Sequence, residues 1–255
     1  MKKIAVLPSL VTLGNLLCGF GAVVCASSEV SPLEVEPNFE LAAWLIFLAM
    51  VFDGLDGRIA RLARTTTRFG TELDSLCDVV SFGVAPAVLV QRMAIYQEHH
   101  LPAEAIWLLS ALFAVCAALR LARFNVLTTP DEEAHLHFQG LPSPAAAGVI
   151  ASMVVVNVCF HGNWIVWLLP FAAVVCGALM ISNIRYVHVL NRILRGRRSF
   201  RYLVEIVFFL IIMALNVRLA LACSFVAYAL TGPVGLLEDR LRSRHHVPAD
   251  QGVHP

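Results

Sequence analysis

Apolar runs long enough to cross a membrane recur along almost the whole chain, separated by short polar segments. A helix that spans a bilayer needs about 20 largely apolar residues, with a lower limit of about 17. We therefore predict an all-α, polytopic membrane helix bundle. Its eight transmembrane helices are expected at residues 9–26, 41–57, 72–95, 104–124, 144–160, 163–182, 202–216 and 217–236. A tight turn near Asn216 joins the last two, for which a single re-entrant pair is the alternative.

The composition supports a membrane protein and excludes several other classes. Of the 255 residues, 58% are hydrophobic and 15% are charged, whereas soluble domains average about 45–50% apolar and about 25% charged residues. This composition excludes a secreted disulfide scaffold, a disordered chain and a basic nucleic-acid-binding protein, so no nucleic acid partner is expected. The net charge of +1 indicates nothing about partners. The 7 cysteines lie mostly in apolar runs and form no CxxC pair, which indicates buried free thiols.

The distribution of charge predicts how the bundle is oriented. With a cytoplasmic N-terminus, the inner segments hold all of the 19 Lys and Arg residues except Arg92 and Arg218, and the outer segments are acidic. Cytoplasmic loops of membrane proteins carry such an excess of basic residues. We expect a multi-pass protein of the cell (inner) membrane with both termini in the cytoplasm. The first run resembles a signal peptide, but many spans follow it, so we predict an uncleaved first helix.

Five acidic residues gather around one short connection. Asp53 and Asp56 end one predicted helix, and Glu72, Asp74 and Asp78 begin the next. The first pair is spaced i,i+3 and the last pair i,i+4, so each pair shares one face of its helix. Because the connection is short, the two helices are antiparallel neighbours, and both pairs lie near the cytoplasmic end. Ionisable groups at membrane depth are costly and are usually functional.

Carboxylates held this close repel one another, and either protonation or bound divalent cations relieve the repulsion. Ligands that are all oxygen suit Mg²⁺, Mn²⁺ or Ca²⁺ better than zinc, and paired ions of this kind can clamp phosphate oxygens. Small residues and phosphate-binding arginines surround the acids: Gly57, Ala60, Gly70, Arg58, Arg61, Arg64 and Arg68. The pattern favours a nucleotide diphosphate substrate. The structural alternative is a set of interhelical salt bridges with arginines that only set the orientation.

These residues form one extended motif. Residues 53–78 read D-x-x-D-G-x-x-A-R-x8-G-x3-D-x3-D, with no departure at any defined position. The motif is similar to the signature of the CDP-alcohol phosphotransferases. Further stretches resemble the branch of that family whose members transfer a phosphatidyl group from CDP-diacylglycerol to L-serine: residues 7–15, 18–20, 81–86, 119–125, 140–144 and 180–186. We therefore expect one transmembrane domain at 1–237, with a family core at 7–186, an additional helix pair at 202–236, and a disordered cytoplasmic tail at 238–255.

The resemblance implies both a reaction and a site. CDP-diacylglycerol and L-serine would give phosphatidylserine and CMP, with Mg²⁺ or Mn²⁺, two ions, as cofactor, in a protein that contacts membrane lipids and forms homodimers. Asp78 would serve as general base for the serine hydroxyl, which is a poor nucleophile at neutral pH. The implied metal ligands are Asp53, Asp56, Asp74 and Asp78. The implied nucleotide-binding residues are Gly57, Ala60, Arg61 and Gly70.

Polar residues elsewhere are candidates for binding the substrates. Thr12 and Asn15 would reach the nucleotide if the first helix packs on the acids. The serine carboxylate calls for cations, and several basic or polar residues lie at the cytoplasmic ends of later helices. The candidate acceptor-binding residues are Arg120, Arg123, Asn125, Arg185 and Ser81. The structural alternatives are orientation of the chain for the arginines and an interhelical hydrogen bond for Ser81.

Two other functions compete with transfer to serine. A sister transferase that uses glycerol 3-phosphate or inositol would need a denser basic pocket or more hydroxyl partners near the later helices. A cation transporter would spread its acids through the membrane depth. Here the acids gather at one end, and Glu205 is the one candidate for a central acid in a later span, which favours an enzyme.

Overall fold

The chain is a bundle of helices that fits the predicted class. The computed structural model describes residues 6–27, 35–62, 67–127, 140–160, 163–184, 186 and 216–245, and these residues contain helices but no strands. The helices are α1 (Val6–Ser27), α2 (Val35–Leu62), α3 (Arg68–Asp78), the π-helical turn η1 (Val79–Val84), α4 (Ala85–Tyr96), α5 (Ala103–Leu127), α6 (Ser143–Phe160), α7 (Asn163–Ile181) and α10 (Val217–His245). With α3, η1 and α4 taken as one continuous helix, the described residues hold 7 helices long and apolar enough to cross a membrane.

Most predicted helices agree with observed ones, and the differences lie at their ends. The helix predicted at 41–57 is the longer α2, which begins at Val35 and ends at Leu62. The helix predicted at 202–216 lies outside the described residues. Its neighbour α10 continues past the predicted end at residue 236 to His245. The first residues of the predicted disordered tail are therefore helical, and residues 246–255 lie outside the described part.

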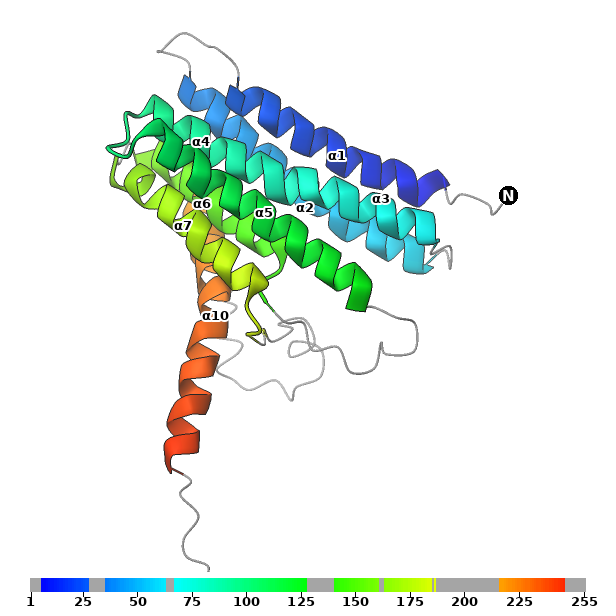
Figure 1. Cartoon of the computed structure of the whole chain (residues 1–255). Helices are drawn as coiled ribbons and strands as arrows, with labels where there is room; N and C mark the ends of the chain where they lie inside the picture. Colours follow the sequence, from blue (N-terminus) through cyan, green and yellow to red (C-terminus); the bar gives the residue numbers. More distant parts are fainter. Residues whose placement is uncertain are drawn as a thin grey trace, which may run out of the picture.

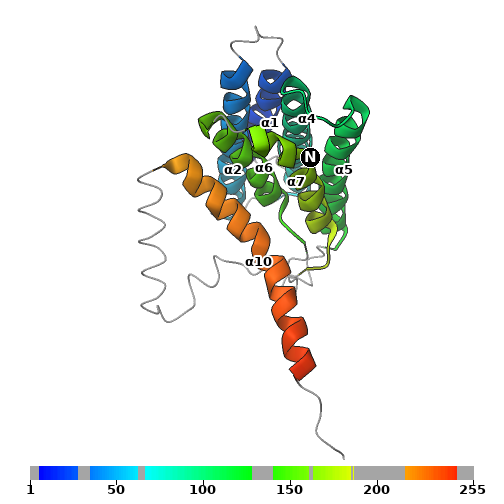
Figure 2. The same cartoon turned by 90° about the vertical axis from the view of Figure 1, so that its left-hand side faces the viewer.

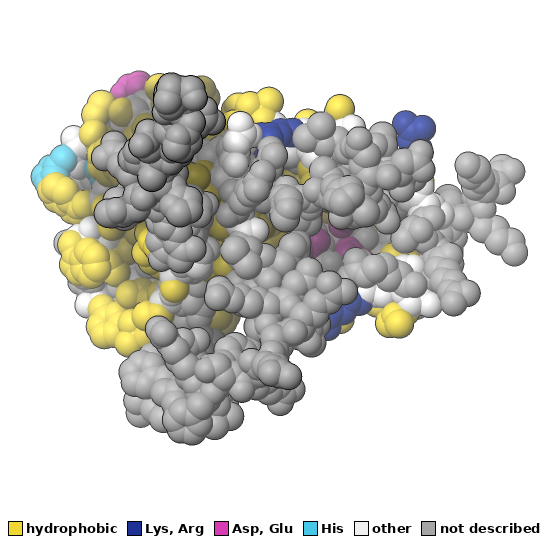
Figure 3. Space-filling view, turned by 90° about the horizontal axis from the view of Figure 1, so that it is seen from below, with side chains coloured by type: hydrophobic (Ala, Val, Ile, Leu, Met, Phe, Trp, Pro, Cys, Tyr) yellow, Lys and Arg dark blue, Asp and Glu magenta, His cyan; other side chains and the backbone are white. Residues whose placement is uncertain are grey.

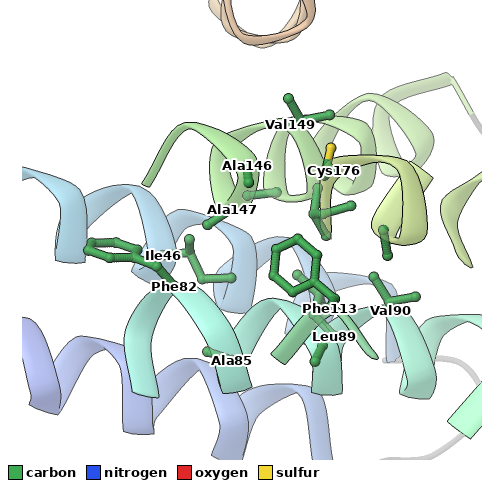
Figure 4. Close-up of a cluster of buried hydrophobic side chains, with 14 of the residues drawn as sticks. Ile46, Phe82, Ala85, Leu89, Val90, Phe113, Ala146, Ala147, Val149 and Cys176 are labelled. Atoms are coloured by element: carbon green, nitrogen blue, oxygen red, sulfur yellow. The ribbon is translucent and has the colours of Figure 1, made fainter. Parts of the chain in front are cut away.

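The helices α1 to α7 lie side by side around a core of apolar side chains (Figure 1). Figure 4 shows Ile46 of α2, Phe82 of η1 and Phe113 of α5 among the buried side chains of this core. Among the described membrane-length helices, α6 is buried over the largest share of its residues, and it is rich in alanine. Small residues let helix backbones approach closely, and such packing replaces the hydrophobic effect as a source of association within lipid.

The last helix, α10, crosses the bundle obliquely, and its far half extends away from it (Figure 2). The N-terminal half of α10 makes several contacts with the rest of the protein. The ring of Phe225 stacks on Phe47 of α2 with 5.7 Å between ring centroids, and Arg218 pairs with Glu40 of α2 at 2.7 Å. The Tyr186 hydroxyl donates a hydrogen bond to the Ala229 carbonyl at 3.1 Å. Burial raises the pKa of Tyr186 to about 12, so this hydroxyl remains a donor at neutral pH.

Two glycines of α10 allow a direct test of this docking. A Cβ at Gly232 would lie 2.7 Å from Cε1 of Tyr186, whereas a Cβ at Gly235 would meet nothing within 4 Å among the described residues. Both changes to alanine gain the same helix propensity, about 1 kcal/mol. We expect Gly232→Ala to be less stable than Gly235→Ala by about 1–3 kcal/mol, the usual cost of overpacking. Thermal unfolding in detergent measures this difference, and equal midpoints would contradict the docking.

Candidate functional site

Three aspartates meet at one end of the bundle. Asp53 and Asp56 come from the C-terminal part of α2, and Asp74 comes from α3, the next helix along the chain. One carboxylate oxygen from each residue lies within 4.8 Å of the other two. Asp56 is buried, and Asp53 and Asp74 are half-buried. Figure 3 shows acidic side chains near the middle of the face seen from below, with Lys or Arg side chains nearby. The predicted juxtaposition across the short connection is therefore present.

The cluster has oxygen atoms that the protein does not satisfy. Asp56 Oδ2 and Asp74 Oδ1 are buried and have no hydrogen-bond partner among the described residues. A buried polar atom without a partner costs about 1–3 kcal/mol, and a charged one costs more. A hard divalent cation, which takes carboxylate oxygen as its ligand, would satisfy both atoms. The residues present thus fit a divalent cation.

Asp78 lies beside this cluster but is not one of its three members. It is the last residue of α3, and it is buried. Its Oδ1 atom accepts a hydrogen bond from Nδ2 of Asn15 at 3.0 Å. Asp78 is still close enough to Asp53 and Asp74 to interact with their charges. The four aspartates of the motif thus divide into a group of three and one carboxylate held separately by α1.

Helix α1 packs against the acid-bearing helices, which is the condition under which Thr12 and Asn15 are predicted to reach the nucleotide. Thr12 is buried, lies beside the Asp56 carboxylate, and donates a hydrogen bond to the Pro8 carbonyl at 3.1 Å. Asn15 is wholly buried. Both side chains therefore lie at the acids, and Asn15 contacts Asp78 directly.

The start of α3 is fixed by a residue that the sequence reasoning missed. Thr67 Oγ1 accepts a hydrogen bond from the backbone N–H of Gly70 at 3.1 Å and so caps the helix. A threonine just before a helix is the recognisable signal for such a cap. The cap sets where α3 begins and hence where Asp74 faces α2.

The other candidate residues at the end of α2 and the start of α3 differ in their exposure. Gly57, Ala60 and Gly70 are half-buried, while Arg58, Arg68 and Glu72 are exposed. The Arg61 side chain and Arg64 lie outside the described residues.

Those candidate acceptor-binding residues that the structure describes lie at the same end of the bundle but make different contacts. Arg120 Nη1 donates to Ser143 Oγ at the start of α6, and Arg120 Nε is buried without a partner among the described residues. Arg120 also lies close enough to Asp53 and Asp78 to interact with them. Arg123 Nη2 donates instead to Oδ1 of Asn183 at 2.8 Å.

The polar candidates make helix-to-helix hydrogen bonds. Asn125 Nδ2 donates to Ser75 Oγ at 2.9 Å and so ties the end of α5 to α3. Ser81 Oγ donates to the Asn15 carbonyl at 3.0 Å, which is the interhelical bond named as the alternative for this residue. Arg185 lies outside the described residues.

Fold and site together define a multi-pass membrane protein with a cluster of aspartates at one end of its helix bundle whose oxygen atoms fit a divalent cation. Comparison with known proteins identifies the family within this broad class. The sequence model of the family described as CDP-alcohol phosphatidyltransferase matches residues 5–180, which run from α1 into α7 and include every acid of the motif. The chain belongs to this family, and α10 lies beyond the matched region.

Several curated proteins are similar to the chain over most of its length. The CDP-diacylglycerol--serine O-phosphatidyltransferase of Helicobacter pylori is 38% identical over 182 residues, which cover 70% of each chain. The protein of the same name from Methanocaldococcus jannaschii is 34% identical over 76% of this chain and 79% of its own. The archaetidylserine synthase of Methanothermobacter thermautotrophicus is 34% identical over 71% of this chain and 69% of its own.

Proposed function

We propose that the chain transfers the phosphatidyl group of CDP-diacylglycerol to the hydroxyl of L-serine, giving phosphatidylserine and CMP. The observation that carries this proposal is the meeting of Asp53, Asp56 and Asp74, with buried oxygens that lack a protein partner. The names of the similar proteins support serine as the acceptor. The site end of the bundle also carries Arg120, a cation for the acceptor carboxylate.

The four aspartates take two tasks in this proposal. Asp53, Asp56 and Asp74 would hold Mg²⁺ or Mn²⁺, two ions, with Asp78 completing the set of ligands. Cations bound there would offset the charge that builds on the phosphate and on the departing CMP. Asp78 accepts the proton of the serine hydroxyl. The serine oxygen then bonds to the phosphorus of the phosphatidyl group as the bond from that phosphorus to the CMP oxygen breaks.

The nucleotide is proposed to lie along α1 and the junction of α2 with α3. The small residues Gly57, Ala60 and Gly70 leave room for the cytidine and its ribose, since a larger side chain at these positions would occupy that space. Thr12 lies beside Asp56 at the same place. Arg61 is assigned to the diphosphate or the acids by the family motif alone.

The proposal places this site at the cytoplasmic face of the inner membrane. Arg58, Arg68, Arg120 and Arg123 stand near the acid end of the bundle, and the opposite ends of the helices carry Glu40, Glu98 and Glu104. Basic residues favour the cytoplasmic side, where serine is also dissolved. We further propose a homodimer, on the resemblance to the family.

An acceptor assay tests the proposed function. Purified protein with CDP-diacylglycerol and Mn²⁺ or Mg²⁺ is expected to release CMP when L-serine is added, and to incorporate labelled serine into lipid. Glycerol 3-phosphate and inositol are the comparison acceptors. CMP release with one of these and none with serine would refute the serine assignment while keeping the transferase class. No CMP release with any acceptor would refute transfer.

Arg120→Ala is expected to raise the apparent KM for serine about 10-fold or more, because a hydrogen bond to a charged group contributes about 1.5–3 kcal/mol. The apparent KM for CDP-diacylglycerol should change far less. Steady-state kinetics with each substrate varied in turn measures the two KM values separately. Arg92→Ala, an exposed arginine at the opposite end of the bundle, is the matched control. Equal changes in both KM values would show that Arg120 only shapes the site through Ser143.

A further inference from the structure

A buried chain of hydrogen bonds joins α1 to the end of α3. Asn15 Nδ2 donates to Asp78 Oδ1 at 3.0 Å, and the backbone carbonyl of Asn15 accepts from Ser81 Oγ at 3.0 Å. Asn15 and Ser81 are both 0% exposed. Asn15 of α1 thus forms one hydrogen bond through its side chain and one through its backbone, and the two partners lie three positions apart on the facing helix.

The local backbone makes this double contact possible. Asp78 is followed directly by the π-helical turn η1, which contains Ser81, and π-helical turns of this kind are frequent at functional sites. One turn along α1 from Asn15, a Cβ on Gly19 would lie 2.6 Å from Cα of Ser81. Glycine at position 19 therefore lets the two backbones approach closely. That close approach fixes the position of Asn15 along the helix axis relative to Asp78.

These contacts affect Asp78, the carboxylate that is not a member of the three-acid group. The Asn15 amide occupies Oδ1 of Asp78 and so determines the direction in which Oδ2 points. We infer that Asn15 is a positioning residue for Asp78, and that Ser81 holds Asn15 in place. This inference rests on the proposed function, in which Asp78 acts on the acceptor hydroxyl. It assigns the Asn15 amide to the carboxylate rather than to the nucleotide.

Kinetics of Asn15→Leu test the inference, since leucine keeps the shape of the side chain and removes the donor. We expect kcat to fall about 10- to 100-fold, the usual effect of losing an outer partner of a site residue. The apparent KM for CDP-diacylglycerol should stay within about twofold, because the nucleotide contacts are unchanged. Ser81→Ala should shift kcat in the same direction by less. The control is Ser152→Ala, which removes an equally buried hydroxyl bonded within α6 and should leave both constants unchanged.

Two results would overturn the inference. A wild-type kcat in Asn15→Leu would show that Asp78 needs no such partner, and a raised KM for CDP-diacylglycerol with unchanged kcat would show a nucleotide contact instead. In either case wild-type protein still releases CMP with serine, so the proposed function stands. Absence of that release in the wild type refutes the proposed function itself.

A reversed pair keeps the test valid if Asn15→Leu fails to fold. Asn15→Asp places two carboxylates side by side and is expected to lower the thermal unfolding midpoint. Adding Asp78→Asn restores one amide and one carboxylate at the same two positions. The double variant should recover the midpoint and the binding of CDP-diacylglycerol, but not turnover. A double variant no more stable than Asn15→Asp alone would refute the coupling of the two side chains.

Discussion

Asp78→Asn is expected to lower kcat by about 10²- to 10⁴-fold, the range that a positioned general base contributes. The amide has the shape of the carboxylate, and its oxygen can still accept the hydrogen bond from Asn15. The variant therefore loses the proton acceptor and keeps the local packing. Single-turnover release of CMP in the presence of saturating serine measures the loss of chemistry directly.

Binding separates this result from misfolding. Asp78→Asn should still bind CDP-diacylglycerol with an affinity near that of the wild type, and its thermal unfolding midpoint should not fall. Turnover within a few-fold of the wild type would exclude Asp78 as the base. In that case the acceptor proton would have to leave by another route, and the separate position of Asp78 would need another explanation.

Asp56→Asn and Asp74→Asn are expected to lower activity at a fixed cation concentration by about 10²-fold or more. Metal ions contribute several kcal/mol of charge stabilisation in a transition state, and each 1.36 kcal/mol corresponds to about a factor of ten in rate. Both residues carry buried carboxylate oxygens without a protein partner. Removing one charge weakens the site, so raised Mn²⁺ should restore part of the activity.

Stability gives a second readout that does not depend on turnover. Wild-type protein should be stabilised by about 2.7 kcal/mol at a cation concentration 100 times the dissociation constant, and the variants should need more cation for the same gain. Without cation, either variant should be at least as stable as the wild type, because one repelling charge is gone. The control is Glu72→Gln, an exposed acid beside the cluster. A wild-type cation response in both variants would contradict the site.

The sequence predicts the acid cluster well because helix geometry determines it. Residues spaced i,i+3 and i,i+4 share a face, and a short connection makes α2 and α3 neighbours. Spacing alone does not determine how far apart two facing side chains lie. The hydrogen bond from Asn15 to Asp78 requires α1 to lie close to the end of α3, as it does to η1 at Gly19, and this contact involves residues far apart in the chain.

Other features lack a periodic signal in the sequence. The π-helical turn after Asp78 has the same residue types as an ordinary apolar helix, so hydropathy predicts one unbroken helix there. The docking of α10 depends on single contacts, such as that of Tyr186 with Gly232, and hydropathy predicts only that a helix is present. Its continuation to His245 also escapes the hydropathy pattern, because the last residues of the helix are polar.

The most direct measurement is the position of Mn²⁺ in crystals of the protein, located by anomalous scattering. We expect a cation signal bounded by Asp53, Asp56 and Asp74, with oxygen ligands at about 2.0–2.6 Å, the distances usual for hard cations, and loss of that signal in Asp56→Asn. A signal elsewhere in the bundle, or an active enzyme with no cation between these three carboxylates, would contradict it.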